Sequence, residues 1–471
     1  MHLETIREEG RDIPVYGEYD IVVCGGGPAG VAAAMASARM GRSVLLIESY
    51  GFLGGVNTAA GVNGIGGWQH DLDGRPLIAG IGREMMYRLA EQGGADPQEV
   101  EQVFLPVSGR PTYREGGLGC YWIRSNPDIV KIVLEDMLIE KGVKLLYHCQ
   151  AVLPIMQDRI VQGVYLENKS GRYAVKAGIV IDCTGDGDLA ARSGAAFQIG
   201  HPHSGHCQPM SLIFTVGNAD IPPLKYDERT DERDVPILER NRYAEAIKLA
   251  RNNREIVLNP NELFCAATPV NRDNRSIRSV NFTRVQCADA TDADQLTQAE
   301  ITGRKQVLES ILFMRRYVKN CENAFLINIL PQIGIRESRR ITGSYVLTQD
   351  DVLNGARFPD SIARGIYLLD IHNLEGVGKS TLRLLDQPYD IPYRSLVPLQ
   401  IDNLLVAGRC ISGDHGALAS YRIISHCLAT GEAAGTAAAL AIKNKQKPRD
   451  ISIEILQQCL VNQGANIGED L

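Results

Sequence analysis

A glycine-rich turn near the N-terminus, residues 25–30, joins a short apolar run to a stretch of small residues. The β-branched run 19–24 predicts a buried strand, and the small residues of 31–40 predict a helix. The turn matches G-x-G-x-x-G, in which the first glycine allows a tight bend, the second lets a pyrophosphate reach the backbone, and the third lets helix and strand pack closely. The phosphates would bind at the helix N-terminus. This pattern predicts a dinucleotide-binding unit with contacts from Gly25, Gly27, Pro28, Ala29 and Gly30.

A second strand and an acidic residue follow in the expected register. Residues 43–47 are apolar and end at Glu48, where the carboxylate that binds the adenosine ribose should lie, with Ser49 beside it. Because strand, turn, helix, strand and acid occur together, the pattern is far more specific than an isolated glycine motif. It fits NAD and FAD equally, since both cofactors contain adenosine diphosphate.

Three further segments favour FAD over NAD, because they resemble segments of FAD enzymes. Gly54-Gly55 resembles the second glycine pair of FAD enzymes of the glutathione-reductase-like superfamily. Thr184-Gly185-Asp186 follows an apolar run and resembles the central Thr-Gly-Asp motif of that superfamily. Gly408-Arg409 follows another apolar run and resembles the segment that carries the flavin ribityl contact. The resemblance implies that all three segments contact a bound FAD.

The resemblance extends over almost the whole chain. Segments 20–30, 185–190, 336–343, 389–394 and 429–435 resemble bacterial FAD-dependent oxidoreductases grouped with the flavoprotein part of heterodisulfide reductase. It implies an α/β fold: a three-layer, Rossmann-like FAD-binding domain with a parallel sheet, and an inserted α+β substrate domain. The cysteine-rich iron–sulfur motifs of heterodisulfide reductase are absent, so disulfide reduction by that route is not expected.

The dispersal of the cofactor segments predicts a discontinuous FAD-binding domain of residues 1–65, 122–200 and 390–471. Residues 66–121 and 201–389 would form the substrate or cap domain.

Local patterns predict individual elements as well. Residues 301–320 predict a helix and 325–330 a strand, and Thr348 with Asp351 predicts a capping box that opens a short helix. Residues 417–443 have helical composition. A helix beginning there, near the flavin, would stabilise the negative charge that develops on reduction.

Charge and cysteine usage narrow the class of protein. A net charge of −7 without basic runs argues against nucleic acid or an anionic membrane as a partner and favours a small-molecule substrate. Neither a secretory signal nor a membrane span is expected from the apolar patterning. The 11 cysteines are scattered without Cys-x-x-Cys, which is typical of reduced thiols in the cytoplasm and not of an iron–sulfur cluster.

Two histidines are candidates for proton transfer, since a flavin exchanges hydride at N5 and the protein must handle the proton. His415 lies between the predicted flavin turn and the last helix, and His372 ends a predicted strand of the substrate domain. We expect His415 to act beside the isoalloxazine, with His372 as the next candidate. The alternative for each is an ordinary structural position.

An arginine-rich segment provides candidates for substrate binding. Arg336, Arg339 and Arg340 lie within five residues, and guanidinium groups bind carboxylates in bidentate fashion. We expect Arg336 and Arg340 to orient an anionic or polar substrate. In an extended segment these two share one face and Arg339 the other, so one ligand cannot engage all three. An inter-domain salt-bridge network with Glu337 is an equally open alternative.

The densest set of metal-ligand types is His201, His203, His206 and Cys207. Zinc would suit these ligands. The stretch is a polar loop with prolines and glycines and has no companion cluster, so we expect no metal.

These features predict an FAD-dependent oxidoreductase that transfers hydride between flavin N5 and a small polar organic substrate. The alternatives are an electron-transferring flavoprotein that serves a larger redox complex, and a chain that binds FAD without redox chemistry. The large part of the chain outside the cofactor segments favours the enzyme. A second strand–glycine turn–helix pattern is missing from the sequence, so electrons should come from the substrate or a protein partner. A homo-oligomer stays open.

Overall fold

A parallel sheet organises most of the chain in the computed structural model. The structure describes residues 5–6, 10–68, 70, 74–105, 120–221, 226–230, 236–238, 243–267, 276–377, 380–383 and 385–468. The sheet runs in the order β5 (Lys144–Leu146), β2 (Val44–Ile47), β1 (Val15–Cys24), β8 (Gly171–Asp182) and β21 (Leu404–Val406), with every pairing parallel. The chain order of the strands reverses beside β1, and in doubly wound sheets the ligand crevice lies at the carboxyl ends of the strands there. The predicted α/β, Rossmann-like fold is confirmed.

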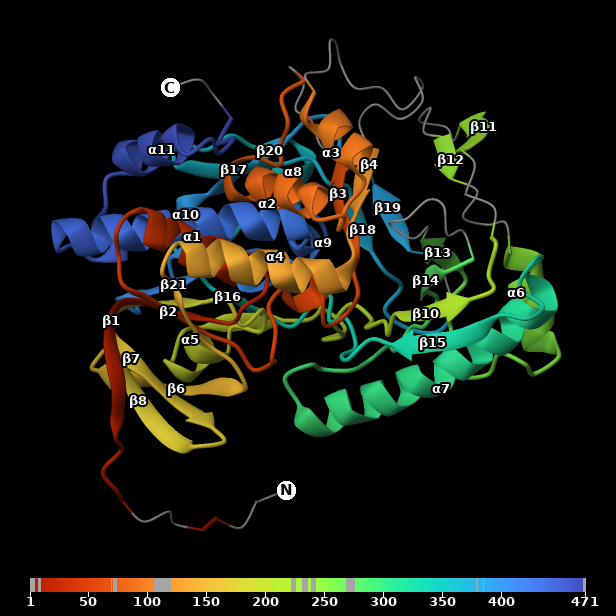
Figure 1. Cartoon of the computed structure of the whole chain (residues 1–471), viewed down its shortest axis with the longest axis horizontal. Helices are drawn as coiled ribbons and strands as arrows, with labels where there is room; N and C mark the ends of the chain where they lie inside the picture. The colour runs from red at the N-terminus through yellow and green to blue at the C-terminus, as the bar shows by residue number, and fades with distance from the viewer. Residues whose placement is uncertain are drawn as a thin grey trace.

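The long strand β8 belongs to two layers. Its first half pairs antiparallel with β7 (Ile160–Asn168), which in turn pairs with β6 (Cys149–Gln157). This meander extends away from the parallel sheet and is seen in yellow in Figure 1. The second half of β8, with apolar side chains buried on both faces, lies between β1 and β21.

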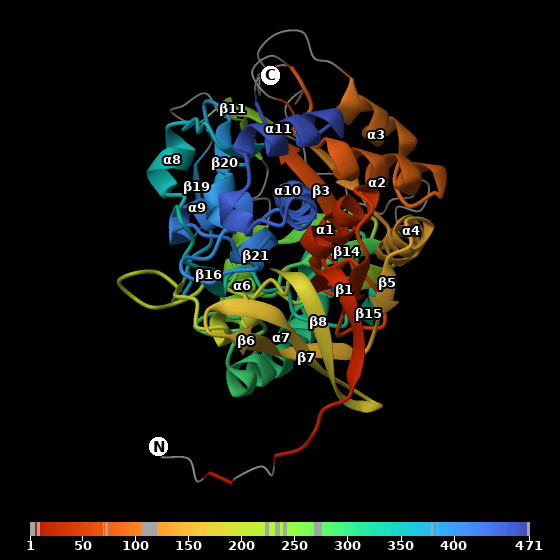
Figure 2. The same ribbon diagram turned by 90° about the vertical axis from the view of Figure 1, so that its left-hand side faces the viewer.

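Two helices from opposite ends of the chain pack backbone to backbone. α1 (Pro28–Arg39) lies against α10 (Ile424–Asn444), and both views show them side by side (Figures 1 and 2). A Cβ added at Gly431 would lie 2.1 Å from the Ala29 carbonyl oxygen, and one at Gly435 would lie 2.2 Å from that of Ala33. This closeness requires glycine, and it holds the last helix against the helix that begins at the glycine-rich turn.

The C-terminal helix differs from the expected single element over 417–443. α9 (His415–Tyr421) begins two residues earlier because the Asp414 side chain accepts the Ala417 N–H at 2.7 Å. The helix then breaks, since Ile423 adopts an extended conformation before α10 starts. The break lets His415 begin a helix of its own.

The other helices and strand predicted from local patterns are confirmed, with some of their bounds shifted. α7 (Ala293–Tyr317) begins before residue 301 because Asp292 caps it by accepting the Gln295 N–H. β15 (Phe325–Ile329) and α8 (Gln349–Leu353) are confirmed, and α8 has the predicted capping box.

A second apolar core lies apart from the first. The antiparallel sheet β13 (Cys265–Ala267), β14 (Arg278–Asn281), β10 (Phe214–Gly217) and β15 packs against α7, at the right of Figure 1. Phe214, Phe282 and Phe313 are buried within it.

The two cores divide the chain differently from the expected domains. The second core uses residues from 210–335 only, whereas α2 (Gly80–Glu91), α3 (Pro97–Phe104) and buried residues of 341–389 belong to the first core. The physical reason is amphipathicity: α2 buries its apolar face against α10 and α4 (Pro127–Glu140). Residues 106–119 of the expected cap lie outside the described residues. Within the described ranges, no helix is both long and apolar enough to cross a membrane.

A buried acid on α10 should make stability depend on pH. Glu432 accepts the Ile81 N–H at the start of α2, and burial raises its pKa from 4.5 to about 7. The folded protein thus favours the protonated form, and this contribution is present below about pH 4.5 and is lost as the pH rises through 7. One pKa unit corresponds to about 1.4 kcal/mol, so the loss is roughly 3 kcal/mol.

Glu432→Gln should therefore match the wild type in melting temperature at pH 5 and exceed it at pH 8, because the amide still accepts the Ile81 N–H without being charged. Thermal melts at both pH values test this. An equal difference at the two pH values would contradict the assignment.

Candidate functional site

The carboxyl ends of β1, β2, β8 and β21 bring the predicted cofactor residues to one edge of the sheet. Gly25 follows β1 with φ of +101°, and a Cβ there would lie 2.4 Å from the Cys183 carbonyl oxygen. A Cβ at Gly30 would lie 1.8 Å from the Gly25 carbonyl oxygen. Both positions therefore require glycine for the fold itself.

Gly27 is different, because its missing side chain leaves open space. The nearest atom to an added Cβ there is the Gly55 Cα at 3.9 Å. Gly27 is the N-cap of α1, which begins at Pro28 and Ala29 without a side-chain cap and without an acid in its first turn. The first N–H groups of α1 are thus available to an anion. Gly54 donates its N–H to the Gly26 carbonyl oxygen at 2.8 Å, which lays the second glycine pair on the turn. Bare backbone from both segments fits a pyrophosphate.

Glu48 is buried at the end of β2 and faces the same turn. Its Oε2 accepts the Gly26 N–H at 2.6 Å, and its Oε1 accepts the Ser49 hydroxyl and the Tyr50 N–H, each at 2.9 Å. The carboxylate is therefore fixed beside the glycine-rich turn, as a ribose-binding acid would be. Ser49 orients Glu48 through its side chain.

The Thr184–Asp186 turn is held in place by hydrogen bonds from nearby side chains. Thr184 donates its hydroxyl to Asp182 at 2.7 Å. Arg409, which follows Gly408, pairs with Asp186 and donates its Nε–H to the Gly185 carbonyl oxygen at 3.0 Å. These side chains brace the turn, so the backbone at Gly185 and Gly408 is what this edge offers to a cofactor.

A buried histidine–carboxylate pair lies beyond this edge. His415, the first residue of α9, has Nδ1 at 2.9 Å from the Glu337 carboxylate, and both side chains are almost fully buried. The other ring nitrogen, Nε2, is buried without a hydrogen-bond partner among the described residues. With Nδ1–H donating to Glu337, Nε2 carries a lone pair that can accept a proton. Edge-on contact with the His201 ring, at 5.1 Å between centroids, packs the imidazole from another side.

Arg340 contacts the His415–Glu337 pair, and its ion pair with Glu337 is the contact that the salt-bridge alternative predicts. It forms an ion pair with Glu337, and it donates to the carbonyl oxygens of Gly413 at 3.1 Å and Gly200 at 3.0 Å. Every nitrogen of its guanidinium is engaged by protein groups, and Gly413 is part of the loop that carries His415. The geometry favours a positioning role for Arg340 over the substrate contact expected from the sequence. Arg339 points elsewhere, to Asp188, so the three arginines do not converge.

His372 also uses both ring nitrogens on protein groups. Its Nδ1 lies 3.0 Å from Arg284 Nη2, and its Nε2 lies 3.1 Å from Asp370 Oδ2. Burial lowers its pKa to about 3, even with Asp370 beside it. A neutral ring that accepts from Arg284 and donates to Asp370 satisfies both contacts. No ring nitrogen is left for a substrate, which favours a structural role for His372 over the proton transfer expected of it.

Arg336 lies near the group formed by His372, Arg284 and Asp370. It donates to the Pro209 carbonyl oxygen at 2.6 Å and to the Ser211 hydroxyl at 2.9 Å. Burial, and then the charges of Arg422 and Arg284, lower its pKa to about 9.

Several side chains here escaped sequence reasoning. Glu337 figured only as a salt-bridge partner, and Gln208, Arg284 and Asp370 were not singled out at all. Gln208 links the His415–Glu337 pair to His372: its backbone N–H donates to Glu337 Oε2 at 2.8 Å, and its side-chain Oε1 accepts the backbone N–H of His372 at 3.3 Å. These residues come from distant segments, and the arginine-rich segment 336–340 was the one signal in the sequence that pointed to this region.

The histidine-rich loop does not gather into a metal site. His206 Nδ1 lies 2.6 Å from Glu375, whereas His201 contacts His415. In the parts of the chain that the structure describes, no three histidine, cysteine or acidic side chains converge as metal ligands.

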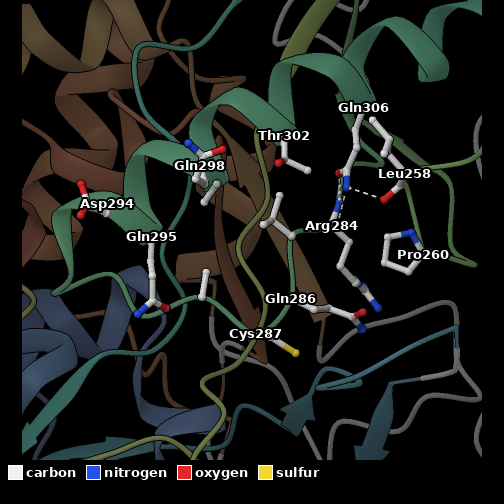
Figure 3. Close-up of a pocket in the computed structure, with 13 residues that line it drawn as sticks. Leu258, Pro260, Arg284, Gln286, Cys287, Asp294, Gln295, Gln298, Thr302 and Gln306 are labelled. Atoms are coloured by element: carbon white, nitrogen blue, oxygen red, sulfur yellow. Dashed lines mark hydrogen bonds between the residues drawn. The ribbon is translucent and has the colours of Figure 1, made fainter. Parts of the chain in front are cut away.

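A surface pocket adjoins the group formed by His372, Arg284 and Asp370. Figure 3 shows it between α7 and the segment after β14, lined by Arg284, Gln286, Gln298 and Thr302 among others. The Gln306 amide fixes the Arg284 backbone by accepting its N–H at 2.7 Å and donating to its carbonyl oxygen at 2.8 Å. Arg284 thus lines the pocket and also contacts His372.

Comparison with known proteins places this geometry in context. The family model described as FAD-dependent oxidoreductase matches residues 20–460. Soluble pyridine nucleotide transhydrogenases of Mycobacterium bovis and Mycobacterium tuberculosis are 59% identical over 39 residues, which is 8% of this chain and 8% of each of those proteins. The match therefore spans less than a tenth of the length of these curated relatives.

Solved structures resemble the whole chain at low identity. A geranylgeranyl bacteriochlorophyll reductase-like protein from Thermoplasma acidophilum is 11% identical, with a TM-score of 0.47 and coverage of 96% of this chain and 85% of that chain. L-proline dehydrogenase from P. horikoshii is 14% identical, with a TM-score of 0.43 and coverage of 96% and 99%. p-Nitrophenol 4-monooxygenase from Pseudomonas putida is 12% identical, with a TM-score of 0.46 and coverage of 94% and 84%.

Proposed function

The chain belongs to the FAD-dependent oxidoreductase family, and on that basis we propose that it oxidises or reduces a small polar organic molecule by hydride transfer between that substrate and flavin N5. The observation that carries the proposal is the buried His415–Glu337 pair, whose Nε2 has no hydrogen-bond partner among the described residues. His415 begins α9, and the hydroxyl of Ser338, next to Glu337, lies 3.4 Å from the Gly185 carbonyl oxygen at the cofactor edge. FAD is the family's cofactor, and when bound it supplies the hydride donor or acceptor.

The residues that would hold FAD come from five places in the sequence. Gly27 and the first N–H groups of α1 suit the pyrophosphate, and Glu48 suits the adenosine ribose. The backbone at Gly54-Gly55, Gly185 and Gly408 would line the remainder. A close backbone approach is what each of these glycines permits.

In the oxidative direction, His415 Nε2 takes the proton from the substrate O–H or N–H group as the substrate carbon loses hydride. Glu337 stabilises the imidazolium that forms and holds the ring orientation by its contact to Nδ1. Arg340 fixes Glu337 and the Gly413 carbonyl group, which keeps the loop before His415 in place. In the reductive direction the same nitrogen returns the proton.

Three finer assignments belong to this proposal. We propose a cytoplasmic location from the scattered cysteines, and a relation to heterodisulfide reductase flavoproteins from the five segments that resemble theirs. An electron-transferring component of a redox complex is the second candidate function, and the buried proton acceptor favours the enzyme, since electron transfer alone does not need it.

Anaerobic incubation of the purified flavoprotein with a panel of small organic substrates tests the proposal. We expect one chemical class to bleach the flavin absorbance stoichiometrically, and air to restore it or a second substrate to reoxidise it. Bleaching by a reduced protein partner alone, with no small molecule active, would favour the electron-transferring component and refute the proposal.

A further inference from the structure

Three arginines lie close to one another near the Asp370 carboxylate, and one of them contacts it directly. Asp370, in β18 (Leu369–Ile371), accepts from Arg422 through its carbonyl oxygen at 2.9 Å and has its carboxylate 3.4 Å from the same guanidinium. Arg284 reaches the group through His372. Arg336 donates to the carbonyl oxygen of Pro209, the neighbour of Gln208, and Gln208 Oε1 accepts the backbone N–H of His372. Burial, and then the charges of Arg422 and Arg284, lower the pKa of Arg336.

The charges in this arginine cluster do not balance. Arg284, Arg336 and Arg422 carry three positive charges, Asp370 carries one negative charge, and His372 is neutral. Glu262, the other acid whose charge acts on Arg284, has Arg251 as its own partner, so two positive charges are left in excess. Because Arg284 is buried away from water, the pKa of its guanidinium is lowered to about 10. Buried charges are normally paired, because the desolvation cost otherwise exceeds the gain.

The unsatisfied polar atoms of the cluster are all donors. Arg284 Nε, Arg422 Nη1 and Gln208 Nε2 are buried without a hydrogen-bond partner among the described residues. The side chain of Arg422 is 9% exposed and Arg284 is 3% exposed. A buried donor without an acceptor costs roughly 1–3 kcal/mol. An acceptor-only, negatively charged group would satisfy both the donors and the excess charge.

We infer that the arginine cluster binds a carboxylate group of the substrate. This inference rests on the proposed function and narrows its substrate class to small organic carboxylates. Guanidinium groups match the planar carboxylate in bidentate fashion. Gln208 contacts both Glu337 and the backbone of His372, so the arginine cluster and the His415–Glu337 pair are neighbours. The carboxylate would bind at the arginine cluster, and the reacting carbon of the same substrate would lie near His415. The pocket lined by Arg284 is the adjoining opening to the surface.

The test measures binding to the oxidised, FAD-loaded protein without turnover. Acetate and succinate are the carboxylate probes, acetamide is the neutral counterpart, and inorganic phosphate is the competing oxyanion. Melting temperature and the flavin difference spectrum are recorded for each titration in a low-salt buffer. We expect succinate to raise the melting temperature and acetamide to leave it unchanged. Phosphate binding more tightly than both carboxylates would overturn the carboxylate assignment.

Arg336→Met is the decisive variant, because Arg336 has no acidic partner of its own among the described residues. We expect succinate to bind it at least tenfold more weakly. Arg336 also donates to the Pro209 carbonyl oxygen and the Ser211 hydroxyl, so a lower melting temperature of the variant without succinate decides nothing. The deciding readout is the rise in melting temperature that succinate causes, which should be present in the wild type and almost absent in the variant. Arg339→Met is the matched control, and its succinate affinity should be that of the wild type. If Arg336→Met does not fold, Arg336→Lys should bind succinate with reduced affinity, because the charge remains and the fork is lost.

Unchanged succinate affinity in the Arg336 variants, or no effect of either carboxylate on the wild type, would overturn the inference. These outcomes are separable from failure of the proposed function. A neutral substrate that bleaches the flavin refutes the carboxylate site alone. Conversely, succinate binding that depends on Arg336 supports the site even where flavin bleaching by small molecules is never observed.

Discussion

Purified Gly27→Asp protein should contain no FAD. The side chain would enter the open space beside Gly55, where a Cβ meets no atom closer than 3.9 Å. The carboxylate would then lie at the uncapped N-terminus of α1, cap the free N–H groups that the pyrophosphate needs and repel its charge. Because the added atoms fit the folded chain, the loss should be of cofactor and not of fold.

The ratio of flavin absorbance to protein absorbance after purification measures this effect. The wild type should approach one FAD per chain, and the variant should show almost none while keeping its circular dichroism spectrum. Gly10→Asp is the matched control, because a Cβ there meets nothing within 4 Å and the residue is remote from the turn; it should retain FAD. A full flavin spectrum in Gly27→Asp would show that the pyrophosphate binds elsewhere.

The cofactor half of the site could be predicted from sequence because its signals are local. Gly25 and Gly30 are each required by a contact within the turn or with the neighbouring strand β8. Glu48 ends a strand that pairs directly with β1, and the hydrogen bond from Gly26 to Glu48 spans one strand–helix–strand unit. Such units have regular geometry, so residue order along the chain sufficed to place the side chains.

The substrate half could not be placed, because its contacts join distant segments. Glu337 and His415 are 78 residues apart, and Gln208 is 129 residues from Glu337. Extended geometry correctly separated Arg339 from its neighbours, but which carboxylate each arginine meets depends on how the two cores pack. Likewise, helical composition did not show the break at Ile423, since that break is set by backbone packing and not by a proline or glycine.

Glu337 is the buried point at which these long-range contacts meet. Its carboxylate accepts from Gln208, Arg340 and His415, with Arg340 as the only fixed positive charge among the three. A proton gained by His415 would add a second positive charge beside the same carboxylate. The pair is therefore arranged to stabilise the protonated imidazole at the moment when a substrate proton has been transferred to it.

His415→Ala should retain FAD but reduce the flavin slowly when mixed with the substrate found by the bleaching screen. The imidazole contacts Glu337 and His201, which lie outside the cofactor segments, so its removal should leave the flavin spectrum intact. Loss of a general base costs roughly 10²- to 10⁴-fold in rate. Stopped-flow absorbance measures this effect.

His203→Ala is the control, because that exposed ring belongs to the same loop as His201 and contacts His201 instead of Glu337; its rate should match the wild type. If His415→Ala reduces its flavin at the wild-type rate, the proton is carried by another group, and the buried pair only stabilises the fold.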